Sequence, residues 1–126
     1  MKYLLDTNII IYHLNGLLND KTQISINSML TLDLQLSIIT KIELLGFKFT
    51  SQKQKLSTQM FVDNVNWILL TIAIADQAIL LRQEYKIKTP DAILAATAIL
   101  GDYTLVSHND KDFKKIVSLK YLNPFS

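Results

Sequence analysis

The sequence predicts an α/β protein: a three-layer α/β/α sandwich with a central, mostly parallel sheet of four to five strands. Two observations lead to this prediction. Short runs rich in β-branched and aromatic residues alternate with helical patterns along the whole chain. The run Trp67–Ile72 is also almost entirely apolar, which is typical of a strand buried on both faces. Alternating strands and helices favour a parallel sheet that helices cover on both sides.

Each expected element follows from its local pattern. Strands are expected at Lys2–Leu5, Leu34–Ile39, Trp67–Ile72, Tyr103–Ser107 and Leu119–Leu122. Helices are expected at Ile9–Leu14, at Ile24–Leu32, from Lys41, and at Ser51–Asn64, Ile74–Tyr85 and Pro90–Leu100. Two consecutive helices between the third and fourth strands leave the direction of the chain there undecided. The order of the elements is better determined by these patterns than their ends.

The composition indicates one domain, residues 1–126, with 49% hydrophobic and 19% charged residues and no linker or repeat. The lack of cysteine excludes disulfides and thiolate metal sites. Asp6 interrupts the first apolar run, unlike a signal peptide. No apolar stretch approaches the roughly 20 residues of a membrane span. We therefore expect a cytoplasmic protein without a membrane segment.

The net charge of +2 is mild and by itself says little about partners. If four of the 11 acids surround a metal ion, however, seven acids remain on the rest of the surface against 13 Lys and Arg. Such a surface would favour the approach of a polyanion. A solvated surface with a slight excess of lysine accounts for the same composition.

Two acids follow the first two expected strands. Asp6 ends the first strand, where open parallel sheets bind ligands, although Asp6 or Asn8 would also suit the cap of the next helix. Glu43 follows the second strand, and the segment Thr40–Glu43 reads as a capping box with Thr40 as N-cap. Each acid alone is therefore explained by the start of a helix.

Two further acids follow the same pattern. Asp91 comes after Thr89, a possible cap, and Pro90, which suits the first helical position. That helix ends at Gly101, a natural residue for the position after a helix. If the strand after Gly101 is parallel to the first strand, the helix must begin at the edge where Asp6 lies.

The fourth acid follows the fourth strand. Asn109 and Asp112 repeat the spacing of a cap and an acid, and Asp110 competes with Asp112 for the role. Four carboxylates at one edge of a sheet repel one another unless a cation compensates for their charge. Mg²⁺ or Mn²⁺ is the usual cation for a set of oxygen ligands. The pattern therefore indicates metal-assisted hydrolysis of phosphodiester bonds.

Four segments also carry a resemblance to a known family. They are Leu5–Tyr12 (LDTNIIIY), Ser37–Gly46 (SIITKIELLG), Thr89–Ala96 (TPDAILAA) and Leu105–Phe113 (LVSHNDKDF). In this order they resemble the PIN-domain family, and more particularly its VapC-type toxins from prokaryotic toxin–antitoxin pairs. The resemblance runs from Lys2 to about Phe113. One departure is His108, where these toxins often carry another polar residue or arginine.

The resemblance implies a PIN-like fold and an endoribonuclease that depends on Mg²⁺ or Mn²⁺, with an RNA substrate, a homodimeric state and a cognate antitoxin that inserts near the active site. It implies that Asp6, Glu43, Asp91 and Asp112 are the catalytic and metal-binding residues. Asp6 and Asp91 would be the main ligands, Glu43 would complete or support them, and Asp112 would act through water or on a second ion. Supporting polar residues would be Thr7, Asn8, Ser107 and Asn109. Cations for the RNA backbone would come from Lys41, Lys48, Lys111 or Lys114.

Three other functions fit parts of the sequence. A catalytically silent PIN-like module that binds nucleic acid or protein would keep the fold without the chemistry. A metal-free ribonuclease could use His13 and His108 as general acid and base. A response-regulator receiver would share the length, but it needs an acid at the end of the third strand, and Asp76 lies four residues beyond Ile72.

Overall fold

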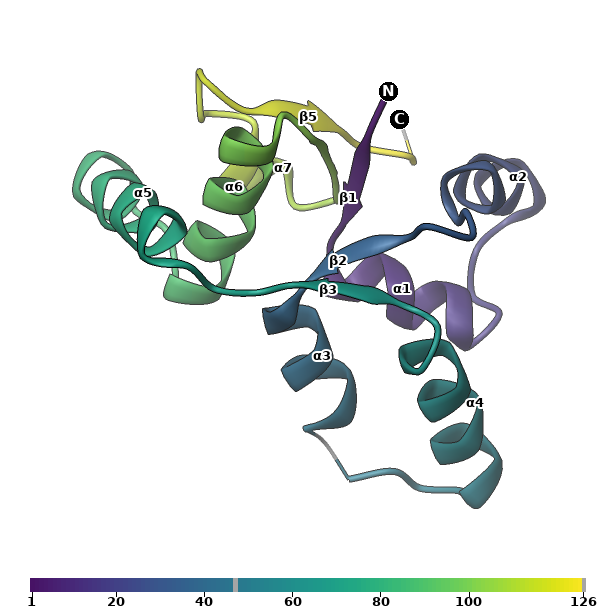
Figure 1. The fold of residues 1–126 in the computed structure, drawn as a ribbon. Coiled ribbons are helices and arrows are strands. Elements are labelled where there is room, and N and C mark those ends of the chain that lie inside the picture. The colour runs from purple at the N-terminus through teal and green to yellow at the C-terminus, as the bar shows by residue number, and fades with distance from the viewer. Residues whose placement is uncertain (47, 126) are drawn as a thin grey trace.

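The computed structural model describes residues 1–46 and 48–125 of the chain (Figure 1). Strands and helices alternate along this part of the chain, as the sequence predicts. The elements are β1 (Tyr3–Leu5), α1 (Thr7–Leu14), α2 (Asp20–Met29), β2 (Gln35–Ser37), α3 (Ile38–Leu45), α4 (Gln52–Val62), β3 (Asn66–Ile68), α5 (Ile72–Glu84), α6 (Thr89–Gly101), β4 (Thr104–Val106), α7 (Asp110–Phe113) and β5 (Lys120–Leu122). None of the helices in the described residues has both the length and the apolar character that crossing a membrane requires.

All paired strands in the described residues run parallel, which confirms the predicted α/β class. One group has the order β1-β4-β5, with Leu5 opposite Val106, and the other pairs β2 with β3. The sequence predicted one sheet of four to five strands, whereas hydrogen bonds divide these strands into three and two. Figure 1 shows β2 and β3 running across the line of β1 instead of alongside it. Strand twist makes such a break easy when every strand has three residues.

The three layers follow from the alternation of side chains along the strands. Leu4 and Leu105 belong to one hydrophobic cluster, which includes residues of α5 and α6. Leu5 and Val106, their neighbours in sequence, belong to a second cluster with residues of α1 and α2. Because successive side chains of a strand point to opposite faces, β1 and β4 separate two cores. Figure 1 shows α5 and α6 on one side of β1, and α1 and α2 on the other.

The strand β3 differs from its prediction. The apolar run Trp67–Ile72 predicted a strand buried on both faces, but β3 ends at Ile68 and its residues are exposed or half-buried. Leu69 and Ile72 beyond it are 65% and 82% exposed. The prediction of double burial was wrong because, among the strands of the described residues, β3 pairs with β2 alone and forms an edge. The receiver alternative also fails, because no acid closes β3 and because β1 pairs with β4 and not with β3.

The start of α3 removes the capping role predicted for Glu43. The N-cap is Ser37, whose hydroxyl accepts a hydrogen bond from the Ile39 N–H at 3.2 Å. Thr40 lies inside the helix, fully buried, with its hydroxyl 3.0 Å from that of Thr7. The predicted capping box Thr40–Glu43 was therefore wrong, because a buried contact between helices binds the threonine. The start of α3 therefore does not account for the acid at position 43.

Both ends of α6 lie one residue from their predicted places. Thr89 is the first helical residue, and the N-cap is Lys88, which makes no side-chain capping bond. At the other end Gly101 is still helical, and Asp102 takes the left-handed conformation with φ 58°. Asp is one of the residues that adopt this conformation at low cost. Glycine suits position 101 for another reason: a Cβ there would collide with the ring of Tyr103.

Candidate functional site

Four acids reach the same edge of the fold from four helices. Asp6 follows β1, Asp112 lies in α7 after β4, and Asp91 lies in the first turn of α6. Because β4 is parallel to β1 and only two residues join α6 to it, α6 starts at the edge where β1 ends. Glu43 arrives from α3. The topology thus brings the start of α6, with Asp91, to the edge where Asp6 lies, as the short connection after Gly101 predicts.

The electrostatics of Asp91 show that the charges of the other three acids act on it. The pKa of Asp91 rises from 3.8 to about 6. Burial is the first cause, and the negative charges of Asp112, Asp6 and Glu43 follow in that order. The charge of Lys88 acts in the opposite direction and lowers the pKa of Asp91. The four carboxylates therefore share one neighbourhood, in which negative charge is in excess.

Asp6 combines a structural contact with a place in this neighbourhood. It is 6% exposed, and its Oδ1 caps α1 by accepting a hydrogen bond from the Ile9 N–H at 3.1 Å. Burial raises the pKa of Asp6, while a hydrogen bond from Ser107, the Ile9 N–H and the charge of His108 act against the rise. The capping role weighed for Asp6 is thus real, and it leaves the second carboxylate oxygen for other partners.

Thr7 ties Glu43 to the site. The Thr7 hydroxyl donates to Glu43 Oε1 at 2.6 Å and lies 3.0 Å from the hydroxyl of Thr40. Both threonines are buried, whereas the carboxylate of Glu43 belongs to an exposed residue. A short hydrogen bond to a charged acceptor is among the stronger ones. The bond therefore fixes the direction of Glu43 from α1, although Glu43 stands on α3.

Asn109 does the same for Asp112. Its Oδ1 caps α7 by accepting from the Asp112 N–H at 3.3 Å, and its Nδ2 donates to Asp112 Oδ2 at 2.9 Å. The Ser107 hydroxyl in turn accepts from the Asn109 N–H at 3.0 Å. Of the predicted supporting residues, Thr7, Ser107 and Asn109 contact acids through side chains, whereas Asn8 reaches Asp6 through its backbone N–H.

Asp110 and Asp112 have different surroundings. Asp110 accepts hydrogen bonds from the Tyr121 hydroxyl at 2.6 Å and from Asn123 Nδ2 at 3.1 Å, and these bonds lower its pKa. Asp112 makes the largest charge contribution to the raised pKa of Asp91, and Asp110 is not among the main causes of that rise. The geometry therefore favours Asp112 as the fourth acid of the cluster and gives Asp110 a different partner.

The two histidines do not form a pair. His13 Nδ1 lies 2.9 Å from Gln23 Nε2, and its ring is 6.5 Å from that of Phe61. The ring of His108 instead lies 5.5 Å from Tyr12 and 5.8 Å from Phe125. Among the described contacts none joins the two imidazoles. This arrangement gives no support to a metal-free mechanism that uses both as acid and base.

The donor set suits a hard divalent cation. All four candidate ligands are carboxylates, which Mg²⁺ and Mn²⁺ prefer, and the raised pKa of Asp91 shows charge that a cation would neutralise. Within residues 1–46 and 48–125, however, no three acidic or histidine side chains form a group that could hold one ion together. Mg²⁺ commonly binds through one or two carboxylates and keeps several waters. The residues fit that mode of binding.

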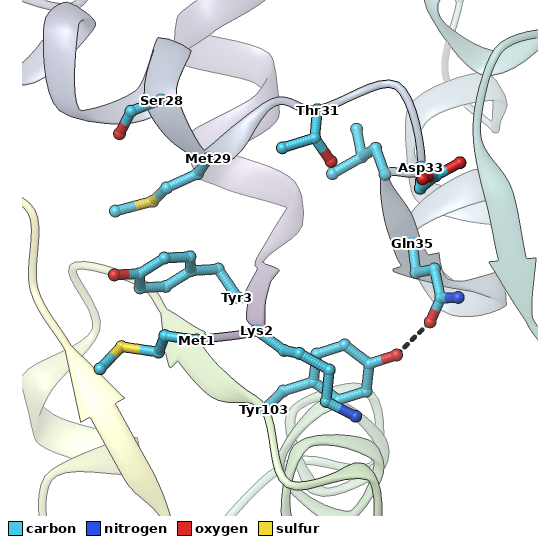
Figure 2. A pocket seen from close by; sticks show the side chains of 10 residues that line it. Met1, Lys2, Tyr3, Ser28, Met29, Thr31, Asp33, Gln35 and Tyr103 are labelled. Carbon is cyan, nitrogen blue, oxygen red and sulfur yellow. Dashed lines mark hydrogen bonds between the residues drawn. The ribbon is translucent and has the colours of Figure 1, made fainter.

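A separate hollow of about 250 Å³ lies at the opposite edge of the fold (Figure 2). It is lined by the starts of β1 and β2, at Tyr3 and Gln35, and by Tyr103 before β4. The Tyr103 hydroxyl donates to Gln35 Oε1, and Lys2 Nζ lies 4.4 Å from the centre of the Tyr103 ring. This hollow therefore lies at the amino ends of the strands, and none of the four clustered acids lines it.

Sequence reasoning missed three residues around the acids. The local pattern around Thr40 predicts a helix cap, that around Tyr121 predicts only a strand, and that around Lys88 predicts no role, whereas the structure places all three near the acids. A periodicity signal was available for Thr40, because it lies one helical turn before the buried Leu44. No local pattern indicates the roles of Lys88 and Tyr121, which depend on tertiary contacts.

Comparisons with known proteins give one family and a consistent set of structures. The family model described as PIN domain matches residues 3–119. A chain of a toxin–antitoxin complex from Klebsiella pneumoniae is 32% identical, with TM-score 0.78 and 98% of both chains covered. The structure of VapBC2 from Rickettsia felis, bound to a DNA fragment from its promoter, has a sequence identity of 25% and a TM-score of 0.80, with 98% of both chains covered. The structure of VapBC-1 from nontypeable Haemophilus influenzae has a sequence identity of 27% and a TM-score of 0.78, with 100% of both chains covered. The search of curated proteins gives no match.

Proposed function

Because the chain belongs to the PIN domain family, whose model matches residues 3–119, we propose that it is a Mg²⁺- or Mn²⁺-dependent endoribonuclease and the toxin component of a type II toxin–antitoxin pair. The observation that carries the proposal is the pKa of Asp91, which burial and three other carboxylates raise to about 6. A fold keeps such a repulsive group when something else compensates for it. The compensating species in this proposal is a divalent cation.

The residues of the chain divide the work between binding and orientation. Asp6, which is buried, and Asp91, which is half-buried, would hold the cation, and Glu43 and Asp112 would complete its surroundings directly or through water. Thr7, Ser107 and Asn109 orient three of these acids by hydrogen bonds. When bound, Mg²⁺ or Mn²⁺ stabilises the charge on the attacking and leaving oxygens of a phosphodiester and lowers the pKa of its water.

An RNA strand would meet positive charge beside the acids. Lys88 lies close enough to lower the pKa of Asp91, and Lys114 acts in the same way on Asp110. Both lysines are exposed. A phosphate backbone that approaches the cation would therefore pair with Lys88, the N-cap residue of α6, and with Lys114 after α7.

Exposed apolar side chains support the proposed protein partners, a second copy of the chain and an antitoxin. Ile42 in α3 is 61% exposed, Ile72 at the start of α5 is 82% exposed, and Leu80 further along α5 is 57% exposed. Exposed apolar side chains are typical of protein interfaces where they form a continuous patch. The similar structures are toxin–antitoxin complexes, which fits an antitoxin partner. A strictly monomeric protein in light scattering that does not bind the product of the adjacent reading frame would contradict this part of the proposal.

The function is tested with the purified protein, single-stranded RNA and Mn²⁺. The wild type should cleave in Mn²⁺ and not in EDTA, and Asp6→Asn, Glu43→Gln and Asp91→Asn should abolish cleavage while circular dichroism stays unchanged. Asp76→Asn is the matched control, because Asp76 is an exposed acid of α5. Expression of the wild type and of Asp6→Asn in a bacterium, followed by mapping of RNA ends, would identify the target.

Cleavage that persists in EDTA or in Asp91→Asn would refute the metal-dependent mechanism. If the EDTA-resistant activity were lost in His108→Ala, the histidine mechanism would take its place.

A second candidate is a catalytically silent PIN-like module that binds nucleic acid or protein. The observation in its favour is that no three acids of the described residues form a group able to hold one ion. Titration with Mn²⁺ separates the two candidates. Saturable binding that Asp91→Asn removes supports the nuclease, and no binding at millimolar Mn²⁺ supports the silent module.

A further inference from the structure

The last described residues of the chain run across the loop that carries part of the acid cluster. This C-terminal segment, residues 120–125, lies beyond residue 119, where the match to the family model ends. The carbonyl of Leu122 accepts a hydrogen bond from the Ser107 N–H at 3.1 Å. The hydroxyl of Tyr121 lies 3.0 Å from the carbonyl oxygen of Ser107. The segment therefore contacts both backbone polar groups of Ser107.

The same hydroxyl reaches the start of α7. Tyr121 donates to Asp110 Oδ1 at 2.6 Å, and Asn123 Nδ2 donates to the same oxygen at 3.1 Å. A hydroxyl has one hydrogen, so the nearby carboxylate and the Ser107 carbonyl share it as acceptors. Burial and the bond to Asp110 raise the pKa of Tyr121, so the hydroxyl keeps its proton at neutral pH. The ring of Tyr121 lies 6.1 Å from that of the buried Phe113.

The residues held in this way are those that orient two acids. Ser107 is fully buried, and its side chain contacts Asp6 and the Asn109 N–H. Asn109 in turn caps α7 and bonds to Asp112. The helix α7 has four residues, far fewer than a helix needs to persist by its own hydrogen bonds. Its position must therefore come from contacts with the rest of the protein.

An apolar contact completes the attachment of the segment. The ring of Phe125 lies 5.8 Å from His108 and 6.3 Å from Tyr12. His108 is the residue between Ser107 and Asn109, and its charge acts on Asp6. The segment thus holds the loop 107–110 by hydrogen bonds at Ser107 and Asp110 and by ring contacts at His108.

We propose that Tyr121 is a positioning residue for the acid cluster, which acts through Ser107 on Asp6 and through Asp110 and α7 on Asp112. The catalytic consequence rests on the proposed nuclease function, whereas the positioning itself does not. The proposal gives Asp110 a role in this attachment instead of a place among the metal ligands. It also explains why an exposed acid two residues from Asp112 makes two side-chain hydrogen bonds of its own.

The test replaces Tyr121 by Phe, which keeps the ring against Phe113 and removes the hydroxyl. Amide hydrogen exchange of the metal-free protein should become at least about tenfold faster at Asn109 and Asp112, with little change in the cores, because the opening is local. Affinity for Mn²⁺, measured by calorimetry, should fall by about tenfold, the usual effect of losing an outer hydrogen bond around a metal.

Tyr85→Phe is the matched control. It removes a half-buried hydroxyl that accepts a hydrogen bond from the Val117 N–H at 3.4 Å, away from the loop, and should change neither quantity. Asp110→Asn is a second variant that weakens the same attachment without altering the core. Combined with Tyr121→Phe, it should add less than its separate effect to the acceleration of exchange, since both changes act on the hydrogen bond between Tyr121 and Asp110.

The outcomes separate this proposal from the proposed function. Unchanged exchange at Asn109 and Asp112 in Tyr121→Phe overturns the positioning role, even if cleavage falls. Faster exchange throughout the protein also overturns it, because the hydroxyl would then serve global stability. A wild type that neither binds Mn²⁺ nor cleaves RNA refutes the nuclease function, and local acceleration of exchange in the variant still supports the positioning role.

Discussion

Replacement of Asp91 by Asn should stabilise the metal-free protein although it abolishes the proposed activity. The pKa of Asp91 is raised from 3.8 to about 6 by burial and by the charges of Asp112, Asp6 and Glu43. A rise of this size means that the ionised carboxylate costs about 3 kcal/mol in the folded protein relative to the unfolded chain. Asn has nearly the same shape and carries no charge. After allowance for solvent screening, we expect a gain of about 1–2 kcal/mol at pH 7.5.

The effect has a defined pH dependence. Because the folded pKa of Asp91 lies above the unfolded one, its stabilising contribution is complete below 3.8 and is lost as the pH rises through about 6. The advantage of Asn over Asp therefore grows across this window. At pH 4.5 it should be about a third of its value at pH 7.5. Comparison of variant with wild type at each pH cancels the titration of the groups that do not interact with Asp91.

Urea denaturation in EDTA at pH 4.5 and 7.5 measures this difference. The matched control is Asp20→Asn, because Asp20 is also an acid in the first turn of a helix but is exposed. Loss of the Asp20 charge should destabilise the protein by about 0.5 kcal/mol, because that charge interacts favourably with the helix dipole. This effect is opposite in sign to the stabilisation expected for Asp91→Asn. Mn²⁺ should stabilise the wild type and not Asp91→Asn, since a ligand stabilises the state that binds it. A loss of more than about 1 kcal/mol in metal-free Asp91→Asn at pH 7.5 would show that the carboxylate serves the fold.

Three further changes test single contacts. Thr7→Val should lower RNA cleavage, because Glu43 loses its hydrogen bond, and should cost about 1–2 kcal/mol of stability, because the buried Thr40 hydroxyl loses its partner. Thr7→Ser, which keeps the hydroxyl, should retain the cleavage rate and the stability measured by denaturation. Lys88→Gln should weaken RNA binding and reduce the slope of log affinity against log salt concentration by about 1. An unchanged slope would show that Lys88 does not contact a phosphate. Gly101→Ala should destabilise the protein by about 1–3 kcal/mol because its Cβ meets the Tyr103 ring, and a neutral result in urea denaturation would refute that packing.

The parts of the fold that the sequence predicted correctly depend on the order of elements. The parallel direction of β1 and β4 follows from alternating strands and helices, and the short connection at Gly101 then places Asp91 near Asp6. These inferences use chain connectivity, which leaves few alternatives once the strands are known. They required no knowledge of side-chain partners.

The parts that the sequence could not predict depend on contacts between distant segments. Thr40 matches a capping box locally, but its hydroxyl bonds to Thr7, 33 residues away. Trp67–Ile72 reads as a doubly buried strand because composition does not distinguish burial within one chain from exposure at an edge. Asp110 and Asp112 both stand in the first turn of α7, and it is the tertiary contact of Tyr121 with Asp110 and the effect of Asp112 on Asp91 that separate them.

The interpretation of these acids as helix caps and their interpretation as a metal site were not true alternatives. Asp6 caps α1 with Oδ1, and the cap itself fixes where the carboxylate lies. Asp91 and Asp112 stand in the first turns of α6 and α7, where helix starts favour negative charge. Helix starts at the carboxyl edge of a parallel sheet thus collect acids for reasons of local stability. What goes beyond local stability is their mutual repulsion, because a cap gains nothing from three neighbouring carboxylates, whereas a cation does.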